Sequence, residues 1–189
     1  HEYIDFTYLG IGKLKLSSIE NRRNALKTII PAIKHLEPSA RDEAVATFKT
    51  RCAAKTMPDD LMMTSDEVRS MRASGMEIGA HTVNHPILAR CDQGTVRREI
   101  RESRSYLEDL LGERVGLFAY PNGKLGDDYR QEHADIAKDL GLDAAVSTNP
   151  GTSAHGNDLF QLSRFTPWDR KTWKFGLRLA QNMTKKPVA

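Results

Sequence analysis

The hydrophobic pattern of residues 17–55 has the period of a helix. Apolar side chains recur every three or four positions, first at Leu26, Ile29, Ile30, Ile33 and Leu36 and then at Val45, Phe48 and Cys52. This spacing predicts two or three helices. Pro31 should kink or restart the first of them, because proline has no amide hydrogen to donate. Residues 1–60 hold no dense group of polar side chains, so we interpret them as an α-helical insertion or appendage.

From residue 61 onwards, short apolar stretches alternate with amphipathic ones. The apolar stretches predict strands at 76–80, 115–120, 143–148 and 162–165, and the amphipathic ones predict helices at 64–74, 95–111, 129–140 and 172–183. The capping box Thr64-x-x-Glu67 opens the first of these helices. Such alternation is typical of β-α units around a mostly parallel sheet, so we expect an α/β fold over residues 61–189.

Composition narrows the class of protein without naming a function. The chain has 189 residues, of which 39% are hydrophobic and 28% charged, which suits one globular domain with or without an appendage. No apolar run approaches the roughly 20 residues that a membrane-spanning helix needs. The 28 basic and 25 acidic side chains are interspersed, so we expect no nucleic-acid partner. Two distant cysteines predict neither a disulfide framework nor a cysteine metal site.

Two histidines follow the predicted strand at 76–80. Reactive groups of parallel β-α folds gather where strands end. A helical turn from His81 to His85 would place the imidazoles about 5–6 Å apart, close enough to bind one divalent ion together. Pro86 would stop that turn from extending. The alternative is a pair of loop histidines with ordinary hydrogen bonds. Three other histidines without spaced partners are expected at the surface: His35, His133 and His155.

Two further segments leave predicted strands. The stretch Phe118-Ala119-Tyr120-Pro121-Asn122-Gly123 predicts a tight turn with outward-pointing amides. Fixed donors of this kind stabilise the negative oxygen of a tetrahedral intermediate, although an ordinary turn is the alternative. Arg164 lies in the apolar stretch 162–165 and should point toward a carboxylate or toward solvent.

The order and spacing of these three segments, over Leu61 to Trp168, resemble the NodB-homology polysaccharide deacetylases. The resemblance implies a deformed (β/α) barrel, incomplete in this chain. It also implies a divalent ion, usually zinc, at which an N-acetyl or O-acetyl group is hydrolysed from a sugar polymer. By the same resemblance, His81 and His85 are metal ligands together with an aspartate.

The resemblance also implies roles for the other two segments. The turn formed by Tyr120, Pro121 and Asn122 lends a backbone amide to the oxyanion, which makes Tyr120 and Asn122 candidate catalytic residues. Pro121 and Trp168 are the candidate substrate-binding residues. Arg164 stands where the family often has a histidine, and we hypothesise that it orients the catalytic machinery.

The chain departs from the family pattern in its acidic residues. The family carries its base and third ligand in a Thr-Phe-Asp-Asp-Gly-like segment on the first strand, and this sequence has no such segment. The one adjacent acidic pair upstream of the histidines, Asp59-Asp60, lies in a predicted loop. The family's frequent arginine is replaced by Ala119. The general acid and base are therefore unassigned.

These patterns predict a metal-dependent hydrolase that removes acetyl groups from a polysaccharide such as a bacterial exopolysaccharide. A chain truncated before His1 would lack the base, and alone would bind metal weakly and be inactive. Two alternatives are a non-catalytic carbohydrate-binding protein with this fold and a hydrolase of small amides. An open barrel exposes strand edges, so self-association is expected. Analogy favours the cell envelope or secretion over the cytoplasm.

Overall fold

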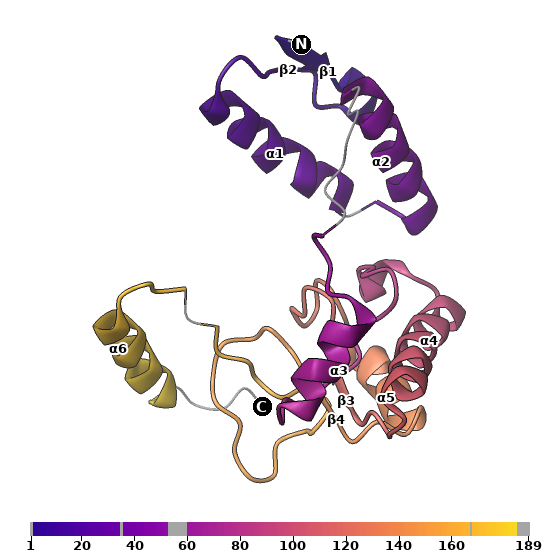
Figure 1. The fold of residues 1–189 in the computed structure, drawn as a ribbon, viewed down its shortest axis with the longest axis vertical. Coiled ribbons are helices and arrows are strands. Elements are labelled where there is room, and N and C mark those ends of the chain that lie inside the picture. Colours follow the sequence, from indigo (N-terminus) through magenta and orange to yellow (C-terminus); the bar gives the residue numbers. More distant parts are fainter. Residues whose placement is uncertain (1, 35, 53–59, 167, 185–189) are drawn as a thin grey trace. The chain divides into compact units, whose positions relative to one another are not determined.

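The computed structural model describes residues 2–34, 36–52, 60–166 and 168–184. The chain divides into two compact units, His1–Met62 and Met63–Ala189. Of the predicted features, Asp59 and His35 lie outside the described residues. Figure 1 shows the elements of both units.

The first unit joins a β-hairpin to two helices. Its elements are β1 (Tyr3–Asp5), β2 (Lys13–Lys15), α1 (Ile19–Lys34) and α2 (Pro38–Cys52), with one 3-10 turn at Thr7–Leu9. The two strands pair antiparallel. Ile4, Phe6, Ala25 and Ile29 form the buried core of this unit. The ring of Phe6 stacks on that of Phe48, with the centroids 5.4 Å apart.

Two expectations for this unit were wrong in part. A hairpin precedes the helices, so the unit is not purely helical; strands of three residues are too short to produce a readable alternation. Pro31 does not restart the helix, since α1 runs through it to Lys34, and the predicted kink stays a prediction. The missing proline amide costs one bond near the helix end, while Ile29 and Ile33 on either side of Pro31 both pack into the core.

The second unit alternates helices with short strands. Its elements are α3 (Ser65–Ala73), a 3-10 turn (Leu88–Arg90), α4 (Gln93–Leu111), β3 (Leu117–Ala119), α5 (Gln131–Asp139), β4 (Ala144–Val146) and α6 (Thr172–Met183). The predicted capping box is confirmed: Thr64 accepts from the Glu67 amide, and the Glu67 carboxylate accepts from the Thr64 amide. Asp92 caps α4 by accepting from the Thr95 amide at 2.9 Å.

The central sheet of this unit is parallel and small. β3 pairs with β4 from Leu117↔Ala144 to Ala119↔Val146. Single bridges add Ala80 beside Phe118 and Leu162 beside Val146, both parallel. The predicted strands at 76–80 and 162–165 are thus reduced to one bridging residue each. The α/β class is confirmed, whereas the described residues form an open sheet and no closed barrel.

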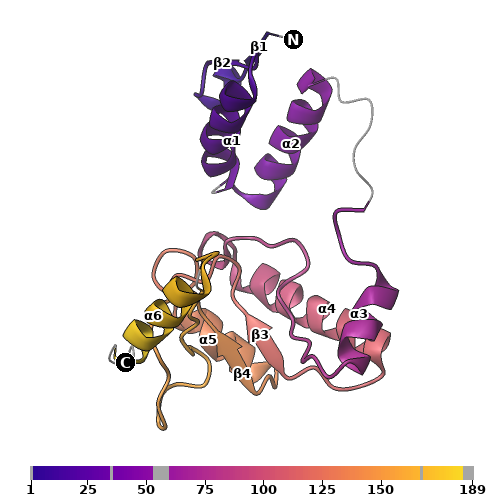
Figure 2. The same ribbon diagram turned by 60° about the vertical axis from the view of Figure 1, so that its left-hand side comes forward.

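One face of this sheet is covered by helices and the other is open. Phe118 and Ala145 are buried in a core to which α4 and α5 contribute Ile100 and Ala137. Figure 2 shows α4 and α5 beside the two strands. Leu117, on the alternate face, is 39% exposed. Because β3 and β4 run parallel, their carboxyl ends lie at the same edge of the sheet. Each strand continues there into a loop.

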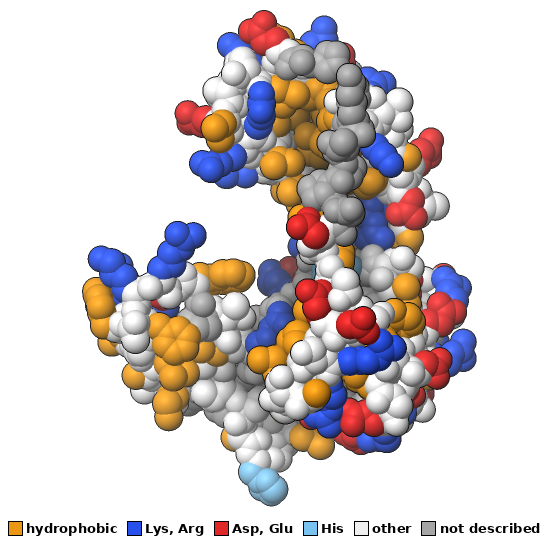
Figure 3. All heavy atoms as spheres, in the orientation of Figure 1, with side chains coloured by type: hydrophobic (Ala, Val, Ile, Leu, Met, Phe, Trp, Pro, Cys, Tyr) orange, Lys and Arg blue, Asp and Glu red, His pale blue; other side chains and the backbone are white. Residues whose placement is uncertain are grey.

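The last helix, α6, exposes most of its surface. Trp173, Phe175, Leu177 and Leu179 are all exposed, and Figure 3 shows hydrophobic side chains on the surface of this helix. Asn182 is buried, and its amide donates to the Gly151 carbonyl at 2.8 Å. Within the part of the chain that the structure describes, no helix has both the length and the apolar character to cross a membrane.

Candidate active site

His81 and His85 lie in a loop that leaves the sheet at Ala80. The expected helical turn is wrong, because Thr82 and His85 have φ angles of 64° and 50°, in the left-handed region. The two imidazoles nevertheless lie close, with ring centroids 4.9 Å apart and planes at 75°. Two nitrogens bound at about 2.1 Å to one tetrahedral ion lie roughly 3.4 Å apart. A centroid separation of 4.9 Å is compatible with one nitrogen of each ring binding the same ion.

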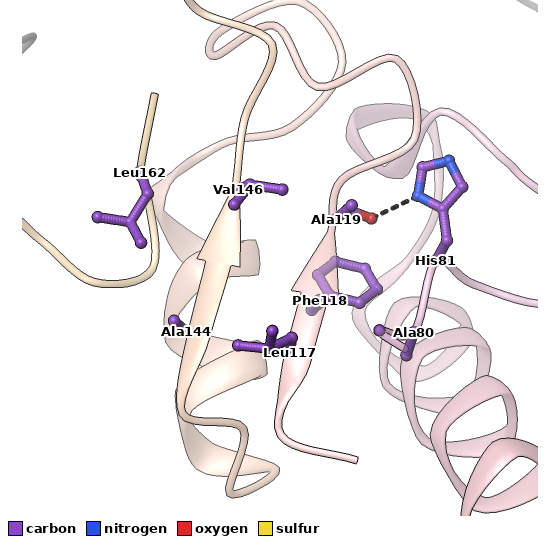
Figure 4. Close-up of a pocket in the computed structure, with 9 residues that line it drawn as sticks. Ala80, His81, Leu117, Phe118, Ala119, Ala144, Val146 and Leu162 are labelled. Carbon is purple, nitrogen blue, oxygen red and sulfur yellow. Dashed lines mark hydrogen bonds between the residues drawn. The ribbon is translucent and has the colours of Figure 1, made fainter. Parts of the chain in front are cut away.

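A hydrogen bond fixes the orientation of the His81 ring. Its Nδ1 lies 2.7 Å from the carbonyl oxygen of Ala119, the last residue of β3. Figure 4 shows the ring turned toward this oxygen. A carbonyl can only accept, so Nδ1 carries the hydrogen and the neutral ring has its lone pair on Nε2. Metal-binding histidines are commonly oriented by such a bond from the second ring nitrogen.

Hydrogen bonds to a residue of α4 hold the loop between the histidines. Glu99 is 6% exposed, and its carboxylate accepts from the backbone amides of Val83 and Asn84, each at 2.9 Å. The Asn84 side-chain amide donates to its other oxygen at 2.8 Å. Sequence analysis missed Glu99. Its position in the sequence could have indicated the burial of Glu99. It lies between Val96 and Ser103 on the apolar face of the helix, and not on the charged face.

The turn after β3 is built on a buried tyrosine. Tyr120 is 1% exposed, its ring stacks on Tyr129 with the centroids 3.8 Å apart, and its hydroxyl donates to the Phe160 carbonyl at 2.8 Å. Burial raises the pKa of the Tyr120 phenol far above its usual range. The phenol therefore stays protonated, and the side chain supports the turn without exchanging protons.

One amide of this turn remains available as a donor. The Tyr120 amide donates to the Val146 carbonyl at 3.2 Å, and the Gly123 amide to the Pro121 carbonyl at 2.6 Å. Asn122 has a φ of 59°, and its carbonyl accepts from the Thr148 hydroxyl at 2.6 Å. No acceptor for the Asn122 amide exists within the described part of the chain. Within the turn predicted to bind an oxyanion, the Asn122 amide is therefore the donor that remains free to bind a ligand.

Comparisons with known proteins show which family the chain belongs to. The family model described as polysaccharide deacetylase matches residues 42–145, which is more than half of the chain. The chain belongs to the polysaccharide deacetylase family. The family recognised from the sequence is confirmed, and the matched range includes His81, His85 and the turn at Tyr120 to Gly123.

Two relatives are similar to this chain. It is 22% identical over 102 residues to YxkH of Bacillus subtilis (strain 168), a protein named for the same family, covering 54% of this chain and 35% of YxkH. It is similar in structure to the Streptococcus pyogenes deacetylase PplD in complex with acetate, with a TM-score of 0.59 and 28% identity. That match covers 68% of this chain and 54% of PplD. The chain thus spans about a third to a half of these relatives.

Two histidine side chains are the candidate metal ligands at this edge. Among the residues that the structure describes, no group of three His, Cys, Asp or Glu side chains could hold a metal ion. The free Nε2 of His81 and the neighbouring His85 ring fit as two ligands of a divalent ion. A third ligand and a carboxylate base do not lie with them in the described ranges.

Beside His81 the open face of the sheet forms a pocket of about 400 Å³. Its walls are apolar, and Figure 4 shows them arranged around both strands: Leu117, Phe118, Ala119, Ala144, Val146 and Leu162. The pocket thus brings the candidate ligand His81 next to a hydrophobic surface that includes Leu117, on the sheet face that α4 and α5 leave uncovered.

The other two predicted site residues, Arg164 and Trp168, have exposed side chains. The Arg164 amide donates to the Asn149 carbonyl at 3.3 Å, which brings its backbone beside the segment that follows β4. The Arg164 side chain is exposed, and Trp168 is 87% exposed. Within the described residues, no hydrogen bond or ion pair joins either side chain to the histidine pair. Their catalytic and substrate-binding roles stay predictions.

One expectation about the other histidines was wrong. His133 is 2% exposed, and its Nδ1 accepts from the Arg130 amide at 2.9 Å, which caps the start of α5. Burial lowers the pKa of His133. His133 is therefore a neutral core residue of α5, while His155 is exposed as expected.

Proposed function

We propose that this chain is part of a metal-dependent hydrolase that removes acetyl groups, on nitrogen or oxygen, from an acetylated polysaccharide. One contact supports this most directly. The Ala119 carbonyl orients His81, and the turn with the free Asn122 amide begins at the next residue. Candidate metal ligands and a candidate oxyanion donor are thereby joined through a single strand end.

The residues of this chain have separate tasks in the proposed reaction. His81 and His85 hold a divalent ion, zinc in our proposal, which when bound polarises the acetyl carbonyl and lowers the pKa of its water. The Asn122 amide donates to the oxygen that becomes negative, and its position is fixed by the Thr148 bond before the substrate arrives. Tyr120 and Pro121 form the rigid turn that presents this amide.

The other assignments of the site belong to the same proposal. Arg164 orients the reacting groups from the strand end beyond β4, and Trp168, with 87% of its surface exposed, contacts the sugar. The side chain of Pro121 is fully buried, so this residue supports the turn and does not contact the sugar. Carbohydrate rings pack well on exposed aromatic faces, because the ring C–H groups and the indole are both apolar.

The wider architecture is part of the proposal as well. The apolar sheet face next to His81 supports a deformed (β/α) barrel whose inner side chains this face would provide. Its open edge would also favour association between copies. A sugar polymer as substrate places the protein in the cell envelope or outside the cell.

A non-catalytic carbohydrate-binding protein is the second candidate function. The observation that favours it is the lack of a third ligand group with the histidine pair among the described residues. Such a protein would bind the same glycan through the same face and would not release acetate.

Acetate release by the native protein that contains this chain separates the two. The assay supplies Zn²⁺ and compares acetylated glucosamine oligomers, O-acetylated sugars and small amides. We expect acetate from the oligomers or the O-acetylated sugars, lost in His81→Ala and retained in His155→Ala, a control at an exposed histidine outside the site. Glycan binding without acetate release would support the non-catalytic protein, and turnover of small amides alone would replace the polymer substrate.

A further inference from the structure

The helix beneath the histidine loop carries a buried carboxylate that makes all of its hydrogen bonds to that loop. Glu99 Oε2 accepts from the amides of Val83 and Asn84, and Oε1 accepts from the Asn84 side chain. No cation pairs with Glu99 within the described ranges. Its charge is therefore stabilised by three donors of one short segment.

This segment needs an external support to keep its shape. Val83 and Asn84 lie between two residues with left-handed φ angles, Thr82 at 64° and His85 at 50°. Such a conformation is unfavourable for a β-branched residue such as threonine, so contacts outside the segment must hold it. Within the segment, the Thr82 hydroxyl accepts from the His85 amide at 3.1 Å. From outside the segment, Glu99 accepts from the Val83 and Asn84 amides.

We infer that Glu99 is a positioning residue for the histidine pair. By holding the Val83 and Asn84 amides, its carboxylate sets the path of the loop between His81 and His85, and so keeps the two rings 4.9 Å apart. The Ala119 bond orients His81 from the strand side, and Glu99 orients the loop from the helix side. This inference rests on the proposed function, in which the pair binds a metal ion.

Zinc affinity of the native protein, measured by titration calorimetry, is the primary test. Glu99→Leu should weaken Zn²⁺ binding by about 10- to 100-fold, the usual cost of losing an orienting contact outside the ligands themselves. The absorption spectrum of bound Co²⁺ should change as well, because the ligand geometry changes. Glu102→Gln is the matched control, since it removes a carboxylate from an exposed position of the same helix. A folded Glu99→Leu protein with wild-type zinc affinity would overturn the inference.

A second pair of variants tests the contact without emptying the buried position. Asn84 is exposed, so Asn84→Asp should fold; its new carboxylate faces that of Glu99 and should weaken zinc binding. Adding Glu99→Gln should restore the affinity, because a glutamine amide donates to the new aspartate while its oxygen still accepts from the loop amides. Failure of the double variant to recover would contradict the positioning role, whatever happens to Glu99→Leu.

The same titration separates this inference from the proposed function. If a His81→Ala, His85→Ala protein binds zinc as tightly as the wild type, the histidines are no ligands and the proposed function fails first. If zinc binding needs the histidines but is indifferent to Glu99 and Asn84, the proposed function stands and only the positioning role is wrong.

Discussion

Left-handed backbone conformation at residues other than glycine is concentrated at the candidate site. Within the described residues, Thr82, His85 and Asn122 are the ones that adopt it. Each costs on the order of 1–2 kcal/mol relative to ordinary backbone, so neighbouring contacts must enforce it. Glu99 and Thr148 supply such contacts. The loops that hold the candidate ligands and the candidate oxyanion donor are therefore specified by their surroundings, and their own sequence alone would favour other conformations.

Gly123 offers a direct test of how tightly the turn is packed. It has a φ of +75°, and an added Cβ would lie 2.9 Å from the Thr148 nitrogen. Gly123→Ala should lower the free energy of unfolding by about 2–4 kcal/mol, because backbone strain and steric overlap add. Gly126→Ala is the matched control, with a φ of +89° and no atom within 4 Å; it should cost about 1 kcal/mol. Equal losses in urea unfolding of the two variants would contradict the close packing.

The buried His133 predicts a pH dependence of stability. Its pKa is lowered mainly by burial, so below the ordinary value of about 6.5 the unfolded chain takes up a proton that the folded chain does not. Stability should therefore fall as the pH drops from 7 to 5. His133→Gln keeps an acceptor for the Arg130 amide and cannot titrate, so its loss over this range should be smaller. Identical pH slopes in urea unfolding would refute this role of His133.

From the sequence, the candidate reacting groups could be chosen, whereas the buried polar groups could not. The histidine pair and the Tyr120 turn could be predicted because their residue types and spacing are unusual together. Glu99 and His133 could not, because charged and polar side chains on a helix are most often solvated, and only the packed structure shows which donor each one meets. The left-handed backbone of Thr82 likewise depends on tertiary contacts.

At the scale of elements, helices were predicted well because their caps and apolar periods are local. α6 begins and ends where predicted, at Thr172 and Met183, and α4 begins at Gln93, two residues early, because Asp92 provides the cap. Strands were predicted less well. Residues 76–80 have the composition of a strand, yet Ala80 alone bridges to the sheet, since strand formation depends on a partner that sequence does not reveal.

The capping box of α3 allows a test of local stability. Thr64→Ala removes the hydroxyl that accepts from the Glu67 amide, and should lower the free energy of unfolding by about 1 kcal/mol. Thr64→Ser keeps a hydroxyl at the same place and should lose much less. The comparison is made by urea unfolding of both variants, and indistinguishable midpoints for alanine and serine would show that the cap contributes nothing.

At the scale of the molecule, the chain has two separate hydrophobic cores. One contains Phe6 and Ile29, and the other contains Phe118 and Tyr120 with α4 and α5. The family match begins at residue 42, inside α2, and so extends from the first unit into the second. The sequence predicted an α/β fold and a change near residue 61 from a helical pattern to alternating strands and helices. It also predicted a barrel, and the sheet in the described residues is too small to form one. Closure of a sheet depends on long-range strand pairing, which has no local pattern.

Two cores predict two units of stability. Phe6 is fully buried and stacks on Phe48, so Phe6→Ala should destabilise the first unit by about 3–5 kcal/mol. Hydrogen exchange followed by mass spectrometry should show lost protection in α1 and α2 and unchanged protection in α4 and α5. Equal loss of protection in all four helices would show that the chain unfolds as one cooperative unit.

The central claim is that His81 and His85 together bind one divalent ion at the edge of the sheet. Metal analysis and zinc titration of the purified wild-type protein, beside a His81→Ala, His85→Ala variant, test it most directly. We predict one zinc site in the wild type that the double variant lacks, with the helical content of both unchanged. Equal zinc content and equal affinity in the two proteins would contradict the claim.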